Sequence, residues 1–403
     1  MVKVLMLLLD GFSSNYLQKE LSPYLYGVSR EGYFSEVEPM FAFQGIGAAI
    51  YSGAPPNRTG VFAEFMMKRN EIVAKSQLLR ALLRVTDTVP SDGLCANIRH
   101  ALFRIAGRDW SGISNVIPSQ LLEYFSPKLV GEYSEENSLR HVPTIFDILR
   151  VNSLSYELQR PSLRLEGAAI GNIASRINGR ETPDFAVIHP CSLDILGHKY
   201  GPHSPQLRSA VGNMDRIVYK VIQSVKFSTE KILTIILSDH GMSPVNYTVN
   251  LLKTLDQLPL ALGSDYLVFL DSTMARFWFF NEKAEKLISD ELNALECGKV
   301  LREHDLKKLC IDRVGREYGE LIFALKEGYA MFPDFFRKHE PPRGMHGYAF
   351  PTHDAPILIT YAPNISVAFK RKEAVRFIDV MPTILKVFNL KIPTTCEGVS
   401  LLD

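Results

Sequence analysis

The sequence predicts an α/β protein, built on a doubly wound, mostly parallel sheet with helices on both faces and carrying two insertions. Four apolar, β-rich runs recur along the chain, and each closes on a polar cluster: residues 4–10, 184–190, 232–241 and 355–363. Helical patterns separate these runs. Strands that are apolar throughout, rather than alternating, are typical of parallel strands buried between two layers of helices.

The first run, Val4 to Leu9, predicts a buried strand. With Lys3 before it, the run also has the look of a signal peptide. However, it is only six residues long, it ends at Asp10-Gly11, and no small-residue cleavage site follows. No uninterrupted apolar stretch reaches the ~20 residues that a membrane-spanning helix needs.

The clearest helix is expected at residues 204–225. Apolar side chains recur there every three or four residues along one face. Ser204 suits the N-cap position and Pro205 the first helical position. Because this helix separates two apolar strands, it supports a mostly parallel sheet covered by helices.

Two stretches interrupt this pattern and are expected to be insertions. Residues 65–175 contain the basic amphipathic segments KSQLLRALLRV and LCANIRHALFRIAGRDW, which predict a mostly helical insertion. Residues 255–340 predict a small α+β cap, with a strand in TMARFWFF and a charged helix from Lys283 to Leu295. The core would then consist of residues 1–64, 176–254 and 341–403. We expect the basic helices to pack as a lid; contact with a membrane surface or a lipid-linked substrate is the alternative.

The composition excludes some partners. Lys plus Arg number 45 and Asp plus Glu number 44, so no global field selects nucleic acid. The five cysteines are odd in number, scattered, and show no CxxC spacing. This usage indicates a reducing compartment, and hence a cytoplasmic location, and it argues against a zinc site built from thiolates.

Acids and imidazoles gather where the predicted strands end. In sheets of this kind, ligands bind outside the carboxyl ends of the strands. Each such residue alone is more often a turn former or a surface group, but their convergence on four ends is hard to dismiss. Carboxylates and imidazoles without thiolates suit zinc, manganese or iron, and six of them fit two three-ligand sites. The residues are Asp10, Asp194, His198, Asp239, His240 and His346.

Several motifs resemble those of the alkaline phosphatase superfamily, and most nearly those of its type I phosphodiesterase/nucleotide pyrophosphatase branch. They are the N-terminal LLLDG, DxxGHxxGP from Asp194 to Pro202, SDHGM from Ser238 to Met242, and the late HGY. The resemblance covers roughly residues 1–62, 180–250 and 341–403. It implies an alkaline phosphatase-like fold.

The resemblance also implies a set of site residues. One ion would be held by Asp194, His198 and His346, and a second by Asp10, Asp239 and His240, with the substrate phosphoryl group between them. Two divalent ions are expected, Zn²⁺ or alternatively Mn²⁺. His353 and Asp354 would support His346 from behind. Gly45, near a helix start, and His203 are expected to contact substrate. His189 is assigned either to substrate contact or to a turn.

The nucleophile of the family does not carry over. Family members place a Thr, Ser or modified Cys at the position that Phe43 occupies here, with Gln44 next to it. Residues 41–50 contain neither Ser nor Thr. Three alternatives remain open: a water activated by the metal pair, Gln44 as ligand or phosphate donor while Tyr51 or Ser52 acts from another register, and binding without turnover.

The expected function is therefore a two-metal-dependent hydrolase or phosphotransferase. Its substrate would be a phosphate monoester or diester, either a small molecule or linked to a glycan or lipid. The alternatives are a metal- and phosphate-binding member of the superfamily without turnover, and a sulfatase-like esterase.

Overall fold

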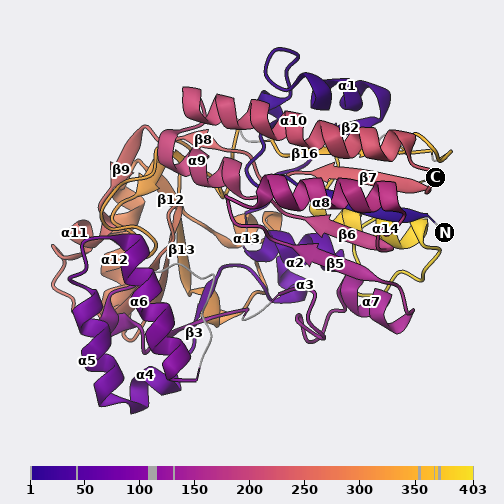
Figure 1. Ribbon diagram of the computed structural model, residues 1–403. Coiled ribbons are helices and arrows are strands. Elements are labelled where there is room, and N and C mark those ends of the chain that lie inside the picture. Colours follow the sequence, from indigo (N-terminus) through magenta and orange to yellow (C-terminus); the bar gives the residue numbers. More distant parts are fainter. Residues whose placement is uncertain are drawn as a thin grey trace.

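The computed structural model describes residues 2–41, 44–107, 116–129, 132–352, 355–366, 368–370 and 374–402. At its centre lies a six-stranded sheet (Figure 1). Its strand order is β2 (Tyr33–Glu36), β16 (Ile357–Tyr361), β7 (Ile232–Leu237), β1 (Lys3–Leu8), β6 (Phe185–Ile188) and β5 (Tyr156–Gln159).

This sheet is mostly parallel, as the sequence predicts. Strand β1 runs parallel to both β7 and β6, and β5 runs parallel to β6. Strand β16 is antiparallel to β7 and β2. Because β16 runs the other way, its amino end lies at the same edge of the sheet as the carboxyl ends of the parallel strands.

Helices cover both faces of the central sheet. Alternate residues of β1 show the two layers, since Val4 and Met6 belong to one apolar core and Leu5 and Leu7 to another. The elements that pack on the Leu5 face are α1 (Pro23–Glu31), α8 (Glu166–Gly179) and α10 (Pro205–Phe227). Those on the Val4 face include α2 (Gln44–Ser52), α7 (Ile145–Val151) and α14 (Val380–Val387). The predicted doubly wound arrangement is therefore confirmed.

The predicted long helix is also confirmed as α10. The Ser204 side chain accepts a hydrogen bond from the Leu207 backbone N–H, so it is the N-cap, and Pro205 is the first helical residue. Its predicted apolar face is buried: Leu207, Val211, Met214, Val218, Val221, Ile222 and Val225.

A second, antiparallel sheet lies beside the first. Its strand order is β10 (Tyr266–Leu270), β11 (Met274–Phe279), β13 (Leu321–Leu325) and β12 (Gly298–Val300). The helices α11 (Leu251–Leu255), α12 (Glu282–Ala294) and α13 (Glu303–Lys308) accompany it. Strand β11 and helix α12 match the strand and charged helix that the sequence predicts in this stretch.

The helices α4 (Glu71–Lys75), α5 (Gln77–Thr86) and α6 (Asp92–Ile105) project from the same end of the molecule (Figure 1). Leu79, Leu83 and Phe103 from these helices share one apolar core with Phe269 and Trp278 of the second sheet. The two predicted insertions therefore pack against each other. Three two-stranded pairs complete the fold: β3 (Phe65–Met67) with β4 (Phe125–Pro127), β9 (Tyr247–Val249) with β14 (Tyr329–Met331), and β8 (Ser243–Pro244) with β15 (Gly344–Met345).

One segment of the range 65–175 belongs elsewhere. Strand β5 joins the central sheet beside β6, and α8 packs on that sheet. The strand was missed because YELQ is half-buried and largely polar, as suits an edge strand, and it lacks the apolar run used to find the others. Helix α7 packs on the central sheet as well. The division into a core and two insertions stays a prediction, and its first insertion has to end before α7.

Within the described ranges, no helix combines the length and the apolar character needed to span a bilayer. All five cysteines lie in described parts of the chain and are free thiols.

Candidate active site

The predicted acids and imidazoles converge at the carboxyl edge of the central sheet. Asp10 follows β1, while Asp239 and His240 follow β7. Helix α9 (Ser192–Tyr200) follows β6 and carries Asp194 and His198. His346 directly follows β15, which pairs with β8 just beyond His240. The structure therefore brings together residues from four distant segments of the chain.

A first triad consists of Asp194, His198 and His346, whose ligand-type atoms lie within 4.8 Å of one another. One turn of α9 separates Asp194 from His198, and the His198 Nε2 lies 3.1 Å from Asp194 Oδ1. The His346 Nε2 lies 3.5 Å from the same oxygen. His198 Nδ1 lies 2.9 Å from the Gly344 carbonyl oxygen, a contact that orients Nε2 towards Asp194.

A second group adjoins the first. His240 Nε2 lies 3.1 Å from Asp10 Oδ1 and 3.7 Å from Asp239 Oδ1. Its Nδ1 lies 2.8 Å from the Gly241 carbonyl oxygen, so Nε2 again faces the carboxylates. The rings of His240 and His346 stack with centroids 3.4 Å apart, and His240 Nε2 lies 3.9 Å from Asp194 Oδ1. The two groups therefore form one continuous cluster.

His189 is part of this cluster, although the sequence analysis assigned it only to substrate contact or a turn. Its Nε2 lies 3.1 Å from Asp10 Oδ2 and 3.7 Å from Asp239 Oδ2. Its Nδ1 is buried and has no hydrogen-bond partner among the described residues. The signal in the sequence was its position directly after β6, at the same edge of the sheet as the predicted residues.

Close backbone approach helps to bring the segments together. Gly11 has φ +75°, and a Cβ at this position would lie 3.0 Å from Asp194 Cα. A Cβ on Gly344 would lie 2.6 Å from the Gly197 carbonyl oxygen. Side chains at these two positions would therefore push α9 away from the loop that carries Asp10 and from β15.

The charges of the three half-buried carboxylates depend on the imidazoles around them. Burial raises the pKa of Asp10 and so does Asp239, but hydrogen bonds to His189 and His240 outweigh both and lower the pKa. The pKa of Asp194 and that of Asp239 are likewise lowered, because His198 and His240 respectively outweigh the effect of burial. The imidazoles therefore favour the ionised form of all three carboxylates, which are half-buried.

The pKa values of the imidazoles shift in opposite directions. Burial lowers the pKa of His189, but hydrogen bonds to Asp10 and Asp239 raise it to about 9. His240 has a pKa well above its usual value, because Asp239 and Asp10 outweigh burial. The pKa of His346 falls well below its usual value through burial and the neighbouring His240, so this ring is neutral.

This donor set fits divalent metal ions. Asp194 Oδ1 is buried without a hydrogen bond of acceptable geometry, although the Nε2 atoms of His198, His346 and His240 surround it at 3.1 to 3.9 Å. Buried charges in proteins are usually paired or bound to metals. Clustered carboxylates and imidazoles are ligands that zinc and manganese accept.

A cleft of about 790 Å³ opens beside the first triad, and Asp194 and His198 form part of its wall. Lys199, Arg337 and Arg343 line it as well. These three cationic side chains suit an anionic ligand, and one further acid, Glu340, lies in the same wall. Asp92, at the start of α6, and Tyr247, in β9, also reach this cleft.

Other predicted residues do not join the cluster. Gln44 opens α2, and its carbonyl oxygen accepts a 2.6 Å hydrogen bond from the Tyr133 hydroxyl. Its Oε1 is buried and has no hydrogen-bond partner within the described ranges. The Gly45 N–H points to the Phe62 carbonyl oxygen at 3.4 Å. His203 is exposed in the turn before α10. In the part of the chain that the structure describes, no hydrogen bond or ion pair connects these three residues to the cluster. Phe43, His353 and Asp354 lie outside the described residues.

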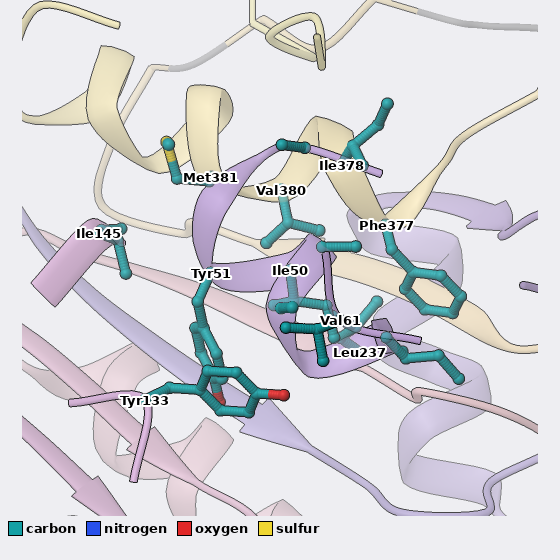
Figure 2. Close-up of a cluster of buried hydrophobic side chains, with 14 of the residues drawn as sticks. Ile50, Tyr51, Val61, Tyr133, Ile145, Leu237, Phe377, Ile378, Val380 and Met381 are labelled. Carbon is teal, nitrogen blue, oxygen red and sulfur yellow. The ribbon is translucent and has the colours of Figure 1, made fainter. Parts of the chain in front are cut away.

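The two hydroxyls proposed as alternative nucleophiles are buried in the core. Tyr51 packs against Tyr133, with ring centroids 5.4 Å apart, inside a cluster of apolar side chains (Figure 2). Burial raises the pKa of Tyr51 well above its usual value, so the phenol stays protonated. The Ser52 hydroxyl is fully buried and donates to the Ala48 carbonyl oxygen at 2.6 Å. These positions argue against both residues as nucleophiles.

The fold and the cluster define a doubly wound α/β protein with half-buried acid–imidazole groups at the edge where such sheets bind their ligands. A family model described as type I phosphodiesterase / nucleotide pyrophosphatase matches residues 4–349. The chain belongs to this family, which confirms the resemblance of its motifs.

Individual relatives are distant. A murine protein described as the catalytic subunit of GPI ethanolamine phosphate transferase 3 is 32% identical over 60 residues, which are 15% of this chain and 5% of that protein. The matched stretches span only 5% to 14% of the length of the first curated relatives.

The fold is shared with solved structures over the whole chain. Human ectonucleotide pyrophosphatase/phosphodiesterase 5 has a TM-score of 0.70 at 15% identity, with 100% of both chains covered. An inactive threonine-to-alanine variant of the murine protein, in complex with AMP, has a TM-score of 0.68 at 15% identity and the same coverage.

Proposed function

We propose that this protein is a metal-dependent hydrolase of phosphate monoesters or diesters. The observation that carries the proposal is the convergence of three carboxylates and four imidazoles at one edge of the sheet, beside a cleft with three cationic side chains. Membership in the type I phosphodiesterase/nucleotide pyrophosphatase family supports hydrolysis of phosphoric esters.

Two divalent ions, Zn²⁺ or Mn²⁺, would occupy the cluster. Asp194, His198 and His346 would hold one, and Asp10, Asp239 and His240 the other. Bound ions of this kind neutralise phosphoryl oxygens and lower the pKa of a bound water to about 7. The chain itself contributes the orientation of its ligands, through the contacts of His198 with Gly344 and of His240 with Gly241.

We infer that water is the attacking group. The murine relative with its threonine replaced by alanine is described as inactive, which fits a threonine nucleophile in that protein. This chain has no Ser or Thr in residues 41–50, and Tyr51 and Ser52 are buried in the core. In direct hydrolysis a bond forms between the water oxygen and phosphorus, the ester P–O bond breaks, and the alcohol leaves with a proton. Gln44 would then be a positioning residue at the start of α2.

Two relatives suggest what kind of alcohol the substrate carries. The murine relative with AMP suggests nucleotides, and the similarity to a GPI ethanolamine phosphate transferase suggests a glycan- or lipid-linked ester. Lys199, Arg337 and Arg343 favour a substrate with negative charge beyond the reacting phosphate.

A second candidate function is binding of metal and phosphate without turnover. The missing hydroxyl beside Gln44 is the observation that favours it. Such a protein would keep the metal ligands and the cationic cleft but would have no group to attack phosphorus.

Two measurements on the purified chain separate these functions. Metal content is determined by mass spectrometry, and hydrolysis of bis-p-nitrophenyl phosphate, p-nitrophenyl phosphate and p-nitrophenyl sulfate is followed with added Zn²⁺ or Mn²⁺. Asp239→Asn should abolish turnover, while Asp290→Asn, an exposed acid on α12, is the matched control. Bound metal with no turnover of any substrate would overturn the hydrolase proposal and favour binding alone.

A further inference from the structure

Helices α5 and α6 present apolar side chains to solvent along one stripe each. On α5 the stripe consists of Leu78, Leu82 and Val85, and on α6 of Leu94, Ile98 and Ile105. The spacing of three, four or seven residues places the members of each stripe on one helical face. Leu78, Val85 and Ile105 are 65% to 85% exposed, whereas Leu82, Leu94 and Ile98 are 36% to 51% exposed.

The exposed residues differ from those through which α5 and α6 pack against the rest of the protein. Leu79 and Leu83 of α5 and Phe103 of α6 are buried in the core shared with the second sheet. The apolar arc of each helix is therefore wider than the face that packs against the protein. Exposed apolar side chains gathered along one face of each helix suit a site of interaction with a protein or a membrane.

The charge around the stripes favours an anionic partner. Residues 68–107 contain seven Lys or Arg and three Asp or Glu, whereas the whole chain has a net charge of +1. Arg84 and Arg104 are exposed on the same two helices, and Lys75, at the end of α4, is exposed next to them. Glu71 pairs with Lys75 at 3.0 Å. Long cationic side chains can extend their charged ends towards lipid headgroups while their stems lie on apolar surface.

The position of the stripes connects them to the cleft. Asp92, the first residue of α6, lines the cleft together with Asp194 and His198, and the stripe of α6 begins at Leu94. Figure 1 shows α4, α5 and α6 projecting at one end of the molecule, beside the second sheet. A partner bound through α5 and α6 would therefore lie near the cleft, because α6 begins at the cleft wall.

We propose that α5 and α6 form a docking surface for a lipid bilayer with anionic headgroups. We call the six exposed residues of the two helices together the apolar stripe. These side chains enter the headgroup region, and Arg84, Arg104 and Lys75 contact the lipid phosphates. A basic helix pair with exposed leucine, isoleucine and valine side chains is suited to lie in the plane of a membrane surface. This docking does not depend on the proposed hydrolysis.

The experiment measures binding of the full chain to vesicles of phosphatidylcholine, with and without phosphatidylserine, by co-sedimentation. The test variant carries Leu78→Ser, Val85→Ser and Ile105→Ser. The control carries Val151→Ser and Phe227→Ser, which remove exposed apolar side chains from α7 and α10. Circular dichroism and thermal unfolding check that both variants fold.

The wild type and the control should bind vesicles with phosphatidylserine, more weakly at high salt. The test variant should bind at least about tenfold more weakly, because each large apolar side chain contributes about that factor when fully buried. Arg84→Glu together with Arg104→Glu should lower binding by about tenfold or more, and only to the anionic vesicles.

Three results would overturn the proposal. The wild type could fail to bind either kind of vesicle, or the control could lose as much binding as the test variant. The third result would show that a second copy of this chain is the partner. In that case light scattering would detect a wild-type dimer, the apolar-stripe substitutions would convert it to a monomer, and neither form would bind vesicles.

Discussion

His189 and His240 approach the same carboxylate from opposite oxygens, each with an Nε2–O distance of 3.1 Å to Asp10. Each also lies 3.7 Å from one oxygen of Asp239. The arrangement makes the two imidazoles near-equivalent neighbours of one carboxylate pair. We therefore expect His189 to bind a metal held by Asp10 and Asp239.

The substitution His189→Ala should weaken the binding of one of two metal ions by about 10- to 100-fold or more. Residues that only orient a metal ligand already contribute about this factor to metal affinity. Metal content after dialysis against a chelator, and competition with a chromophoric chelator, measure this directly. His203→Ala is the matched control, since His203 is exposed and apart from the cluster. Equal metal content and affinity in both variants would show that His189 has another role.

Metal binding should also stabilise the fold. Three half-buried carboxylates lie together, and a divalent ion that binds them in the folded chain shifts unfolding by mass action. At a free metal concentration of 100 times the dissociation constant, the free energy of unfolding should rise by about 2.7 kcal/mol. Thermal unfolding with and without Zn²⁺ or Mn²⁺, and after chelation, measures the change.

In that experiment Asp194→Asn should lose most of the metal-induced rise, because Asp194 contacts both groups of the cluster. Asp290→Asn should keep it. If the two variants respond to metal alike, the ions bind elsewhere on the chain.

Much of the fold and the cluster could be predicted from the sequence, because the determining features are local. Strands β1, β6, β7 and β16 are continuous apolar runs, and the parallel strands β1, β6 and β7 each place polar residues at the same edge of the sheet. Strand β16 runs the other way, so the residues that follow it lie at the opposite edge. The Ser204-Pro205 start of α10 and its apolar face are likewise local patterns.

The rest depends on contacts between distant residues. His189 lies 179 positions from Asp10, so its role becomes visible only when β6 is placed next to β1. The core that joins α5 and α6 to the second sheet combines Leu83 with Phe269, and nothing in either segment indicates the other. Strands β5 and β2 are half-exposed edge strands without an apolar run, so pattern reading passes over them.

A pH dependence of stability is expected from Glu64. Burial, with a smaller contribution from the nearby Asp271, raises the pKa of Glu64 to about 8. Between the pKa of the unfolded chain, about 4.3, and about 8, the folded protein holds a proton that the unfolded chain has lost. The free energy of unfolding should therefore fall as pH rises through this window, and the contribution is fully present only below it.

Glu64→Gln should remove this contribution, so the free energy of unfolding of the variant should fall less than that of the wild type between pH 5 and 9. The difference between the two proteins should be on the order of 1.4 kcal/mol per unit of pKa shift. Urea unfolding at several pH values measures the difference. Glu135→Gln, at an exposed position, is the control and should follow the wild type. Parallel curves for the wild type and Glu64→Gln would contradict a raised pKa at this position.

The final prediction concerns the stereochemical course at phosphorus. If water attacks directly, one in-line displacement occurs and the product of a chiral thiophosphate ester should have inverted configuration. An enzyme with a covalent intermediate makes two displacements and retains the configuration, because each step inverts once. The buried positions of Tyr51 and Ser52 favour inversion.

The configuration of the thiophosphate product decides between the two routes, and a search for phosphorylated protein by mass spectrometry supports the assignment. Tyr51→Phe is the matched variant: it removes the buried hydroxyl and keeps the ring that packs against Tyr133. Under direct hydrolysis this variant should keep the turnover of the wild type. Three outcomes would instead show that a protein hydroxyl attacks phosphorus: retention of configuration, a phosphorylated tyrosine or serine, or loss of turnover in Tyr51→Phe with unchanged metal content. In that case α2 would have to move before the reaction, because it buries both hydroxyls in the core.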